Sequence, residues 1–499
     1  MMYHYSRNRA LFTDLYQLTM SQGYFDLGMH EKIATFELFF RSNPFKSGYS
    51  IACGLPLALE YLSNLQFSSD DLDYLRKQNI FSEELLDFLK DLRFTGTVDG
   101  VSEGSAVFPY LPLIRVTAPL IEAQLVETAL LNIINYSTLI ATKAARICSA
   151  ARGGRVVEFG LRRAQGDSAY IGTRAALVGG CVGTSFVQAG KIWDAPISGT
   201  QAHSWVQTFD NELDAFIAYS EIFPDNCLLL IDTYSVLRSG TPNAIEVARR
   251  LKERGKQLVG VRIDSGDLAY LTMEVYRAFK KAGFPDISIV LSNDLDEFLI
   301  ESIVQQIKND RTGPSEEEKL FREETIRHIL YGVGTKLITG EQEAALGGVY
   351  KLVALDGHPK IKVSENVTKT INPGVKNIWR VIDNNNGYFF ADIMGLHDDN
   401  PPESGDWIYH PIDSLKKVKL PENIAVKPLF QPFIKNGKVL LEISGDWRKP
   451  QEYCKDQLKM LHPTHQRLLN PHTYKVSLTE RLFSLKMDLI EAHTKHPVM

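Results

Sequence analysis

The chain has 499 residues, too many for one ordinary core, and its 44% hydrophobic and 23% charged residues are typical of a globular protein of two or three domains. A formal net charge of −5 excludes a general attraction to nucleic acid or to an anionic membrane, so an anionic substrate requires a local basic pocket. The five cysteines lack CxxC or zinc spacing, residues 1–9 lack the apolar core of a signal peptide, and no stretch is apolar enough to span a bilayer. We therefore expect a cytoplasmic protein with buried thiols.

The first part of the chain mixes helical and strand patterns, and we expect residues 1–120 to form an N-terminal domain. Apolar spacing predicts a helix over 14–27 and acidic amphipathic helices over roughly 68–92. Strands are predicted over 33–40, 98–107 and 113–117.

A long apolar segment over 119–151 predicts one buried helix, because it carries few charges on any face. Gly153-Gly154 follow it as a stop signal. From here we expect an α/β barrel domain over 121–345.

Five short apolar runs in this domain each end in reactive polar residues. Runs of this kind are typical of buried parallel strands, and helical patterns separate several of them. The loops after parallel strands converge on one edge, where α/β enzymes have their active sites. The polar ends are Arg162-Arg163 after 156–160, Asp232 after 228–231, Asp264 to Asp267 after 258–263, Ser292 to Asp294 after 288–291, and Gly332 to Thr335 after 328–331.

Residues 309–324 are a charged excursion within the predicted barrel, and we expect a surface insertion there. The last part of the chain, 396–499, is predicted to be a small C-terminal domain. It has a strand pattern over 439–443 and a final helical pattern over 478–493.

The segment between the barrel and the C-terminal domain has the pattern of two hairpins, over 349–363 and 379–394. Asp356-Gly357 and Asn386-Gly387 supply the turn signals, because these dipeptides favour the backbone of tight hairpin turns. We therefore expect antiparallel strands here.

His203 lies in the segment 199–204, among small residues that leave its ring open to a ligand. Imidazole suits proton or phosphoryl transfer near neutral pH. Because the chain has twelve histidines, a structural or surface role for this one stays open.

Two strand ends carry charges that suit an anionic substrate. Arg162 and Arg163 can bind carboxylate or phosphate through paired N–H donors, or form a surface ion pair. Asp264 and Asp267 flank a glycine turn and can hold ribose hydroxyls or Mg²⁺. Helix capping by Ser265 or Asp267 is the structural alternative, and it can coexist with ligand binding.

A glycine turn, Tyr331-Gly332-Val333-Gly334-Thr335-Lys336, ends the last of the five runs. Its N–H groups and the Thr335 hydroxyl can approach a phosphate, although an ordinary tight turn has the same pattern. The spacing is not that of a dinucleotide motif or a Walker A loop.

Tyr16, in the first predicted helix, can pack in the core or stack on a flat aromatic substrate.

Taken together, these segments closely resemble the nicotinate phosphoribosyltransferase family. Each match is weak alone, but seven in family order across about residues 10–380 are highly specific. The matching stretches are TDLYQLTM at 13–20, EFGLRRAQ at 158–165, GTQAHS at 199–204, RIDSGDL at 262–268, SNDLDE at 292–297, YGVGTK at 331–336 and GGVYKLVA at 347–354.

The resemblance implies an irregular α/β barrel of the type II phosphoribosyltransferase kind. It also implies an N-terminal β-sandwich-like α+β domain, completed by about 346–395, and a small C-terminal domain. The implied reaction joins nicotinate to 5-phosphoribosyl 1-pyrophosphate in NAD salvage, giving nicotinate mononucleotide and pyrophosphate. ATP is the implied co-substrate, Mg²⁺ the implied cofactor and a homodimer the implied assembly.

Residue roles also follow from the resemblance. His203 corresponds to a histidine that ATP phosphorylates, and Tyr16 to a tyrosine that stacks on nicotinate, often from the neighbouring subunit. Arg162 and Arg163 correspond to arginines near the nicotinate carboxylate and the phosphoribosyl site. With His203, the catalytic residues implied are Arg262 and Asp264, and the other substrate-binding residues are Gly199, Thr200, Ser265, Gly266, Asp267, Asn293, Gly332, Gly334 and Thr335. Lys336 stands where some members have a small hydroxyl residue.

Two alternatives remain. A sister enzyme acting on nicotinamide or quinolinate would share the fold, but nicotinamide has no charge to pair with Arg163, and quinolinate, with two carboxylates, needs a more basic site. A silent homologue acting as a binding protein is the alternative of another class. The intact catalytic segments disfavour it.

Overall fold

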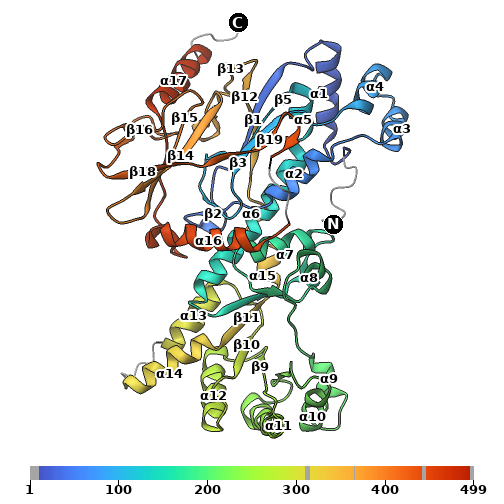
Figure 1. Ribbon diagram of the computed structural model, residues 1–499, viewed down its shortest axis with the longest axis vertical. Helices are drawn as coiled ribbons and strands as arrows, with labels where there is room; N and C mark the ends of the chain where they lie inside the picture. Colours follow the sequence, from blue (N-terminus) through green and yellow to red (C-terminus); the bar gives the residue numbers. More distant parts are fainter. Residues whose placement is uncertain (1–9, 309–314, 365, 441–444, 495–499) are drawn as a thin grey trace. The chain divides into compact units, whose positions relative to one another are not determined.

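The computed structural model describes residues 10–308, 315–364, 366–440 and 445–494 (Figure 1). Three predictions fall wholly or partly outside these residues. They concern the absence of a signal peptide at 1–9, the first part of the excursion over 309–324, and most of the strand predicted over 439–443. The chain divides into two compact units, one over 143–341 and one formed by the segments before and after it. The predicted three-domain division stays a prediction.

The unit over 143–341 is built on one parallel sheet of six strands. Every neighbouring pair in it runs parallel, and each of the five predicted runs supplies one strand. The prediction of parallel strands from the apolar runs is therefore confirmed. In spatial order the strands are β7 (Gly183–Thr184), β6 (Arg155–Glu158), β11 (Ile329–Val333), β10 (Ser288–Leu291), β9 (Gly260–Ile263) and β8 (Leu228–Leu230).

Helices connect these strands along the chain, as βα units require. Several have amphipathic patterns with one buried face, for example Val275 and Phe279 in α12. The helices are α7 (Ser168–Val178), α8 (Val187–Trp193), α9 (His203–Gln207), α10 (Glu212–Ile222), α11 (Thr241–Glu253), α12 (Leu268–Lys281), α13 (Glu297–Lys308), α14 (Glu316–Arg327) and α15 (Thr335–Ile338).

The described part of the charged excursion, predicted to be a surface insertion, is the helix α14. The Ser315 hydroxyl caps the helix by accepting the Glu318 N–H at 3.2 Å. Glu316 and Glu317 also lie in its first turn, where carboxylates interact favourably with the helix dipole. A serine followed by acidic residues is a helix-start signal.

The α/β class is confirmed, but the barrel is not closed within the residues that the structure describes. β7 and β8 are the two edges of the sheet. Beyond β7, one parallel bridge joins Thr184 to Ile197, and Ser198 donates to the Thr184 carbonyl at 2.9 Å. The chain then leaves the sheet at Gly199 and continues to α9, so no strand links the two edges.

The other unit contains a seven-stranded sheet and a six-stranded sheet. In the first, β1 pairs antiparallel with both β5 and β12, so strands from the two ends of the chain share one sheet. Its order is β13 (His358–Pro359), β12 (Val349–Leu355), β1 (Ile33–Phe39), β5 (Ile114–Pro119), β3 (Thr97–Val101), β19 (Phe430–Lys435) and β20 (Lys438–Val439). The second has the order β17 (Lys417–Lys419), β16 (Trp407–Tyr409), β21 (Val476–Leu478), β15 (Phe389–Leu396), β14 (Lys376–Asp383) and β18 (Ile424–Pro428), and β2 (Ser50–Ile51) pairs with β4 (Ala106–Val107).

The helices predicted in this unit are present, with one correction, and α2 and α16 were not predicted. The helix predicted over 119–151 is two helices, and Pro119 ends the strand β5. At the break, the Leu125 carbonyl accepts a hydrogen bond from the Thr13 hydroxyl at 3.2 Å. The helices are α1 (Leu15–Asp26), α2 (Leu55–Ser63), α3 (Ser69–Lys77), α4 (Glu83–Asp91), α5 (Leu120–Leu125), α16 (Arg448–Met460) and α17 (Glu480–Thr494), together with the first part of α6 (Glu127–Ala150), whose residues 143–150 belong to the unit over 143–341.

Both predicted hairpins are present. β12 pairs antiparallel with β13, and Asp356 and Gly357 between them have φ values of 49° and 76°. β14 pairs antiparallel with β15 across Gly387, whose φ is 76°. Positive φ at the turn residues is what the Asp-Gly and Asn-Gly signals predict.

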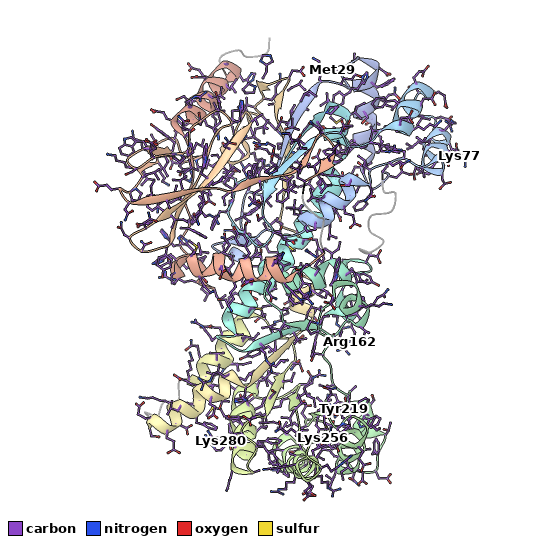
Figure 2. The ribbon with its side chains drawn as sticks, in the orientation of Figure 1. Met29, Lys77, Arg162, Tyr219, Lys256 and Lys280 are labelled. Atoms are coloured by element: carbon purple, nitrogen blue, oxygen red, sulfur yellow. The ribbon has the colours of Figure 1, made fainter. Side chains whose placement is uncertain are left out.

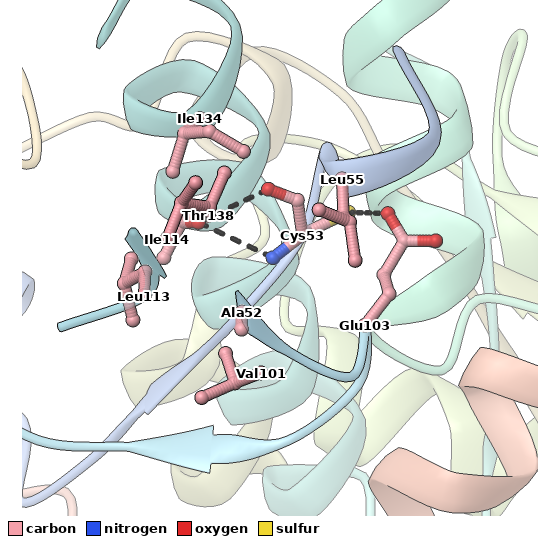
Figure 3. Close-up of a pocket in the computed structure, with 9 residues that line it drawn as sticks. All are labelled: Ala52, Cys53, Leu55, Val101, Glu103, Leu113, Ile114, Ile134 and Thr138. Carbon is pink, nitrogen blue, oxygen red and sulfur yellow. Dashed lines mark hydrogen bonds between the residues drawn. The ribbon is translucent and has the colours of Figure 1, made fainter. Parts of the chain in front are cut away.

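A small cavity lies in this unit beside Cys53, Glu103 and Thr138 (Figure 3). The Glu103 carboxylate accepts the Gly54 N–H at 2.7 Å and contacts the Cys53 thiol at 3.3 Å. The cavity has a volume of about 10 Å³, which holds no more than a water molecule, so it is not a substrate site.

All five cysteines are thiols without a disulfide bond, and four of them are buried. Among the described residues, no helix has the length and apolar character to cross a membrane.

A buried ion pair joins β14 and β15, two neighbouring strands in the second sheet of this unit. Arg380 of β14 donates to both carboxylate oxygens of Asp392 of β15, at 2.8 and 2.7 Å. The same guanidinium donates to Gln457 at 2.6 Å and to the Ala106 carbonyl at 2.7 Å. Both charged side chains are nearly inaccessible to solvent, so each depends on the other for its solvation.

Removal of one charge from this pair leaves the other buried and unpaired. We expect Asp392→Asn to lower the free energy of unfolding by about 3–5 kcal/mol. Urea titration followed by circular dichroism measures this change. Asp398→Asn, which removes an exposed partner of Arg481, is the matched control and should leave stability unchanged. Equal effects of the two variants would contradict the dependence on burial.

Candidate functional site

Arg262, at the end of β9, is the centre of a hydrogen-bond network at the carboxyl edge of the parallel sheet. Its Nε donates to Ser292 Oγ at 2.8 Å, and its terminal nitrogens donate to Thr200 Oγ1 at 3.2 Å and to Asp264 Oδ1 at 3.1 Å. The Ser292 hydroxyl also donates to Asp264 Oδ1. The guanidinium lies 6.0 Å from the centre of the Phe159 ring. Residues from three separate loops are thereby held around one cation.

Asp232, which follows β8, holds the next loop of the network. Its Oδ2 accepts the backbone N–H of Asp264 at 2.8 Å and the hydroxyl of Ser265 at 2.7 Å. Its Oδ1 is buried and has no hydrogen-bond partner among the residues that the structure describes. A buried carboxylate oxygen without a donor is costly, and a bound cation or ligand donor would satisfy it.

His203 begins α9 and is half-buried. Its Nδ1 lies 3.1 Å from Thr233 Oγ1, and Thr233 adjoins Asp232 in the chain. Thr200, three residues before His203, contacts Arg262. The predicted histidine is therefore connected to the Arg262 network from both sides.

Arg162 and Arg163 lie in a short 3₁₀-helix, Leu161–Arg163, directly after β6, and Figure 2 labels Arg162. Both side chains are exposed, and neither guanidinium has a side-chain partner in the described part of the chain. The structural alternative of a surface ion pair is therefore not seen for either arginine. Two adjacent cations without partners are free to bind an anion.

A buried carboxylate fixes the turn that carries these arginines. Glu158, at the end of β6, accepts the Gly160 N–H and the hydroxyls of Thr173 at 3.2 Å and Thr184 at 2.6 Å. Burial raises the pKa of Glu158, and the hydrogen bonds from Thr184, Gly160 and Thr173 oppose this shift. The carboxylate joins β6 to α7 and β7 and so sets where the 3₁₀-helix begins.

The glycine turn has a packing explanation in addition to the predicted phosphate role. Gly332 lies inside β11, opposite Val157, and a Cβ there would lie 2.5 Å from the Phe159 ring. Gly334 precedes α15, which Thr335 begins. The predicted role of these residues toward a phosphate stays a prediction.

Other predicted residues have visible structural roles. Asp267 caps α12 by accepting the Tyr270 N–H at 3.0 Å, and Gly266 before it has a φ of 85°, so the capping alternative is confirmed. Asn293 is exposed and has a φ of 94°, a conformation rare outside glycine.

Tyr16 lies on α1 in the other unit and is about half exposed. Burial raises the pKa of Tyr16, and the charge of Glu127 adds to the shift. At 47% exposure, Tyr16 is more accessible than a core tyrosine.

The site residues implied by the resemblance do not include Asp232, Thr233 and Ser292, although Asp232 and Ser292 were among the predicted polar strand ends. Each follows an apolar strand, as Asp264 does, so position after a strand was the available signal. The structure brings Thr200, His203, Arg262, Asp264 and Ser265 together. Gly199 has open space around it.

The carboxylates of Asp232 and Asp264 suit Mg²⁺. This ion binds through one or two carboxylates and otherwise through water and substrate phosphates. Within the described ranges no group of three or more His, Cys, Asp or Glu residues could hold a metal alone. The free oxygen of Asp232 fits an ion that arrives with a phosphate ligand.

Cations, carboxylates and a histidine lie at the carboxyl edge of a parallel α/β sheet, which is where α/β enzymes have their active sites. Three family models match this chain and together cover most of it. They describe the nicotinate phosphoribosyltransferase N-terminal domain over residues 11–135, the nicotinate phosphoribosyltransferase family over 155–389 and its C-terminal domain over 375–486. The chain belongs to the nicotinate phosphoribosyltransferase family, and it is an enzyme.

Relatives match over nearly the whole chain. Nicotinate phosphoribosyltransferase of Bacillus subtilis (strain 168) is 41% identical, covering 96% of this chain and 95% of that protein. The Caenorhabditis elegans protein of the same name is 36% identical, covering 95% and 92%. A crystal structure of human nicotinic acid phosphoribosyltransferase matches with a TM-score of 0.80 at 30% identity, covering 96% of this chain and 99% of that one. A nicotinate-nucleotide pyrophosphorylase from Pyrococcus furiosus, at 20% identity and a TM-score of 0.67, shares the fold.

The raised pKa of Glu158 predicts a pH dependence of stability. Below this pKa the folded protein keeps a proton that the unfolded chain releases above the ordinary value of 4.5. The Glu158 contribution to the free energy of unfolding therefore falls as the pH rises from 4.5 through the raised pKa. Urea titrations of the parent and Glu158→Gln over this range should show the difference between them falling with pH. Glu221→Gln, at an exposed position, is the control, and a difference that rises or stays constant would contradict the assignment.

Proposed function

We propose that this chain joins nicotinate to 5-phosphoribosyl 1-pyrophosphate, giving nicotinate mononucleotide and pyrophosphate as the entry step of NAD salvage from nicotinate. The observation that carries the proposal is the network of Arg262, Asp264 and Asp232 at the carboxyl edge of the sheet, with two unpaired arginines at the end of β6. The family match, extending over nearly the whole chain, supports it.

The residues of the network suit displacement at the anomeric carbon of the ribose. In this step the bond to pyrophosphate breaks, the pyridine nitrogen bonds to the same carbon, and positive charge develops on the ribose ring. Arg262 uses three of its five N–H donors on protein partners, which leaves two for phosphate oxygens. Asp264, fixed by Arg262 and Ser292, places a negative charge near the developing cation.

Asp232 and Asp264 are the residues that would hold Mg²⁺. When bound, the ion neutralises charge on the leaving pyrophosphate. Asp232 already orients the Asp264 backbone and the Ser265 hydroxyl, so the loop is preorganised for such a ligand. The protein's contribution is mainly positioning and electrostatic stabilisation.

Arg162 and Arg163 are proposed to bind the nicotinate carboxylate and the phosphoribosyl site. A guanidinium binds a carboxylate through parallel N–H donors, and both side chains are free to do so. Nicotinamide offers no negative charge there, and quinolinate brings a second carboxylate that this pair alone does not match. The pair therefore favours a monoacid.

His203 is proposed to couple ATP to the reaction. The γ-phosphoryl passes to a ring nitrogen with ADP as the leaving group, and hydrolysis later releases phosphate. Thr233 contacts Nδ1, which leaves Nε2 without a partner among the described residues. A phosphate on His203 places an added anion beside the Asp232 loop, and we infer that it orders the Mg²⁺–pyrophosphate end. A homodimer in the cytoplasm, with Tyr16 stacking on nicotinate in the neighbouring subunit, completes the proposal.

Pyrophosphate release tests the substrate. With 5-phosphoribosyl 1-pyrophosphate and Mg²⁺, we expect turnover with nicotinate, enhanced by ATP, and little with nicotinamide or quinolinate. Arg163→Met should lower kcat/KM for nicotinate by about 10–100-fold, because it removes a charge-assisted pair, and should change the value for nicotinamide less. Arg249→Met, at an exposed position of α11, is the control.

The outcomes separate the alternatives. Preference for another pyridine would retain the fold and overturn the assignment of the carboxylate to Arg163. No release with any of the three pyridines would favour a binding protein.

Replacement of His203 tests the ATP coupling. In His203→Ala the ratio of rates with and without ATP should fall to about one, because no ring nitrogen accepts the phosphoryl group. The ratio and phosphohistidine content, measured with γ-labelled ATP, are the readouts. His358→Ala, in the exposed edge strand β13, should keep both. Full stimulation by ATP in His203→Ala would contradict the proposed role of His203 in ATP coupling.

A further inference from the structure

Two consecutive carboxylates, Asp296 and Glu297, anchor the loop between β10 and α13. The loop carries Ser292, a member of the Arg262 network, and it contains two residues with positive φ, Asn293 at 94° and Asp294 at 45°. Such a backbone is strained for residues other than glycine and persists only where surrounding contacts hold it. The two carboxylates are those contacts.

Glu297 attaches one side of the loop to α6. Its carboxylate pairs with Lys143 at 2.8 Å and with Arg146 at 2.9 Å, and all three side chains are at most 1% exposed. Removal of one member of a buried cluster of charges leaves the others without solvation, so the contact holds α13 firmly to α6. This side of the loop is a fixed support.

Asp296 attaches the other side of the loop to the glycine turn. Its Oδ1 accepts the Leu299 N–H at 2.7 Å and caps α13, while its Oδ2 accepts from Lys336 Nζ at 3.1 Å. The Asp296 side chain is 8% exposed and that of Lys336 24%. Lys336 directly follows Thr335, so one ion pair joins the loop that carries Ser292 to the turn that carries Thr335.

Lys336 has two possible uses, as a cation for a substrate phosphate or as a partner for Asp296. Burial acts to lower the pKa of Lys336, but the bond to Asp296 and the charges of Glu341 and Asp294 outweigh this and raise it. The lysine is therefore charged, and a carboxylate within hydrogen-bond distance cancels most of its attraction for a distant anion. The pairing satisfies Asp296, whose other oxygen is already used by the helix cap.

We propose that the Asp296–Lys336 ion pair is a positioning strut that holds the Ser292 loop and the Thr335 turn in one arrangement around the phosphoribosyl substrate, and that Lys336 is not itself a phosphate ligand. This inference rests on the proposed function for the substrate that it names. Position matters here because small displacements of binding groups reduce catalysis steeply.

A double-mutant cycle separates the two uses of Lys336. Lys336→Met, Asp296→Asn and the double variant are compared for binding of 5-phosphoribosyl 1-pyrophosphate with Mg²⁺, measured by isothermal titration calorimetry. A strut predicts that each single change raises Kd about tenfold and that the double change does no more than one alone. In the same variants, KM for 5-phosphoribosyl 1-pyrophosphate should rise together with Kd, while KM for nicotinate changes little. Asn keeps the oxygen that caps Leu299, so α13 retains its cap.

Control and rescue variants make the result specific. Lys319→Met breaks an exposed pair with Glu316 in the same unit and should leave Kd unchanged. Lys336→Arg should restore part of the binding, because it keeps the ion pair with Asp296.

Three outcomes would overturn the inference. One is weaker binding in Lys336→Met with normal or tighter binding in Asp296→Asn, which identifies Lys336 as a phosphate ligand. Another is effects that multiply in the double variant. The third is a parent protein that does not bind the substrate, which would also overturn the proposed function. Binding and coupling as expected without turnover of nicotinate would overturn only the choice of pyridine.

Discussion

The guanidinium of Arg262 is the constraint on which the site depends. It joins the loops after β9 and β10 and the segment before α9, at the carboxyl edge of a sheet in which β9 and β10 each have a neighbouring strand on both sides. Its charge keeps Asp264 in place, and Asp232 fixes the backbone of Asp264 from the neighbouring strand. The parallel sheet holds the ends of the strands rigidly. The hydrogen bonds of Arg262 then fix the hydroxyls and carboxylates at these ends in one defined arrangement.

The sequence allowed prediction of most of the elements that carry chemistry. A short, nearly continuous apolar run that ends in Arg262 and Asp264 is typical of a buried parallel strand, whose last residues lie at the carboxyl edge of the sheet. The same logic found the turn signal at Asp356-Gly357, whose backbone has the positive φ that the dipeptide favours. Strand ends and tight turns of this kind can be predicted because a few adjacent residues determine them.

Features that depend on distant residues could not be found in this way. Its place after an apolar run predicted Asp232 as a polar strand end, but not its contact with the Ser265 hydroxyl, 33 positions away in the chain. Gly332 suggested a phosphate, but a Cβ at this position would meet the ring of Phe159, which directly follows the adjacent strand β6. The open edge at β7 depends on how one segment, near Gly199, leaves the sheet. Pairing across such distances is set by tertiary packing, which no local pattern records.

The pairing of β1 with β12 has a consequence for synthesis of the chain. Phe36 of β1 pairs with Leu352 of β12. One edge of β1 therefore stays unpaired until the ribosome has made more than two thirds of the protein. The unit over 143–341 is complete before then and can fold while β1 still presents an unpaired edge. Exposed apolar strand edges recruit other chains, so nascent protein is most prone to aggregation during this interval, and chaperone demand should concentrate there.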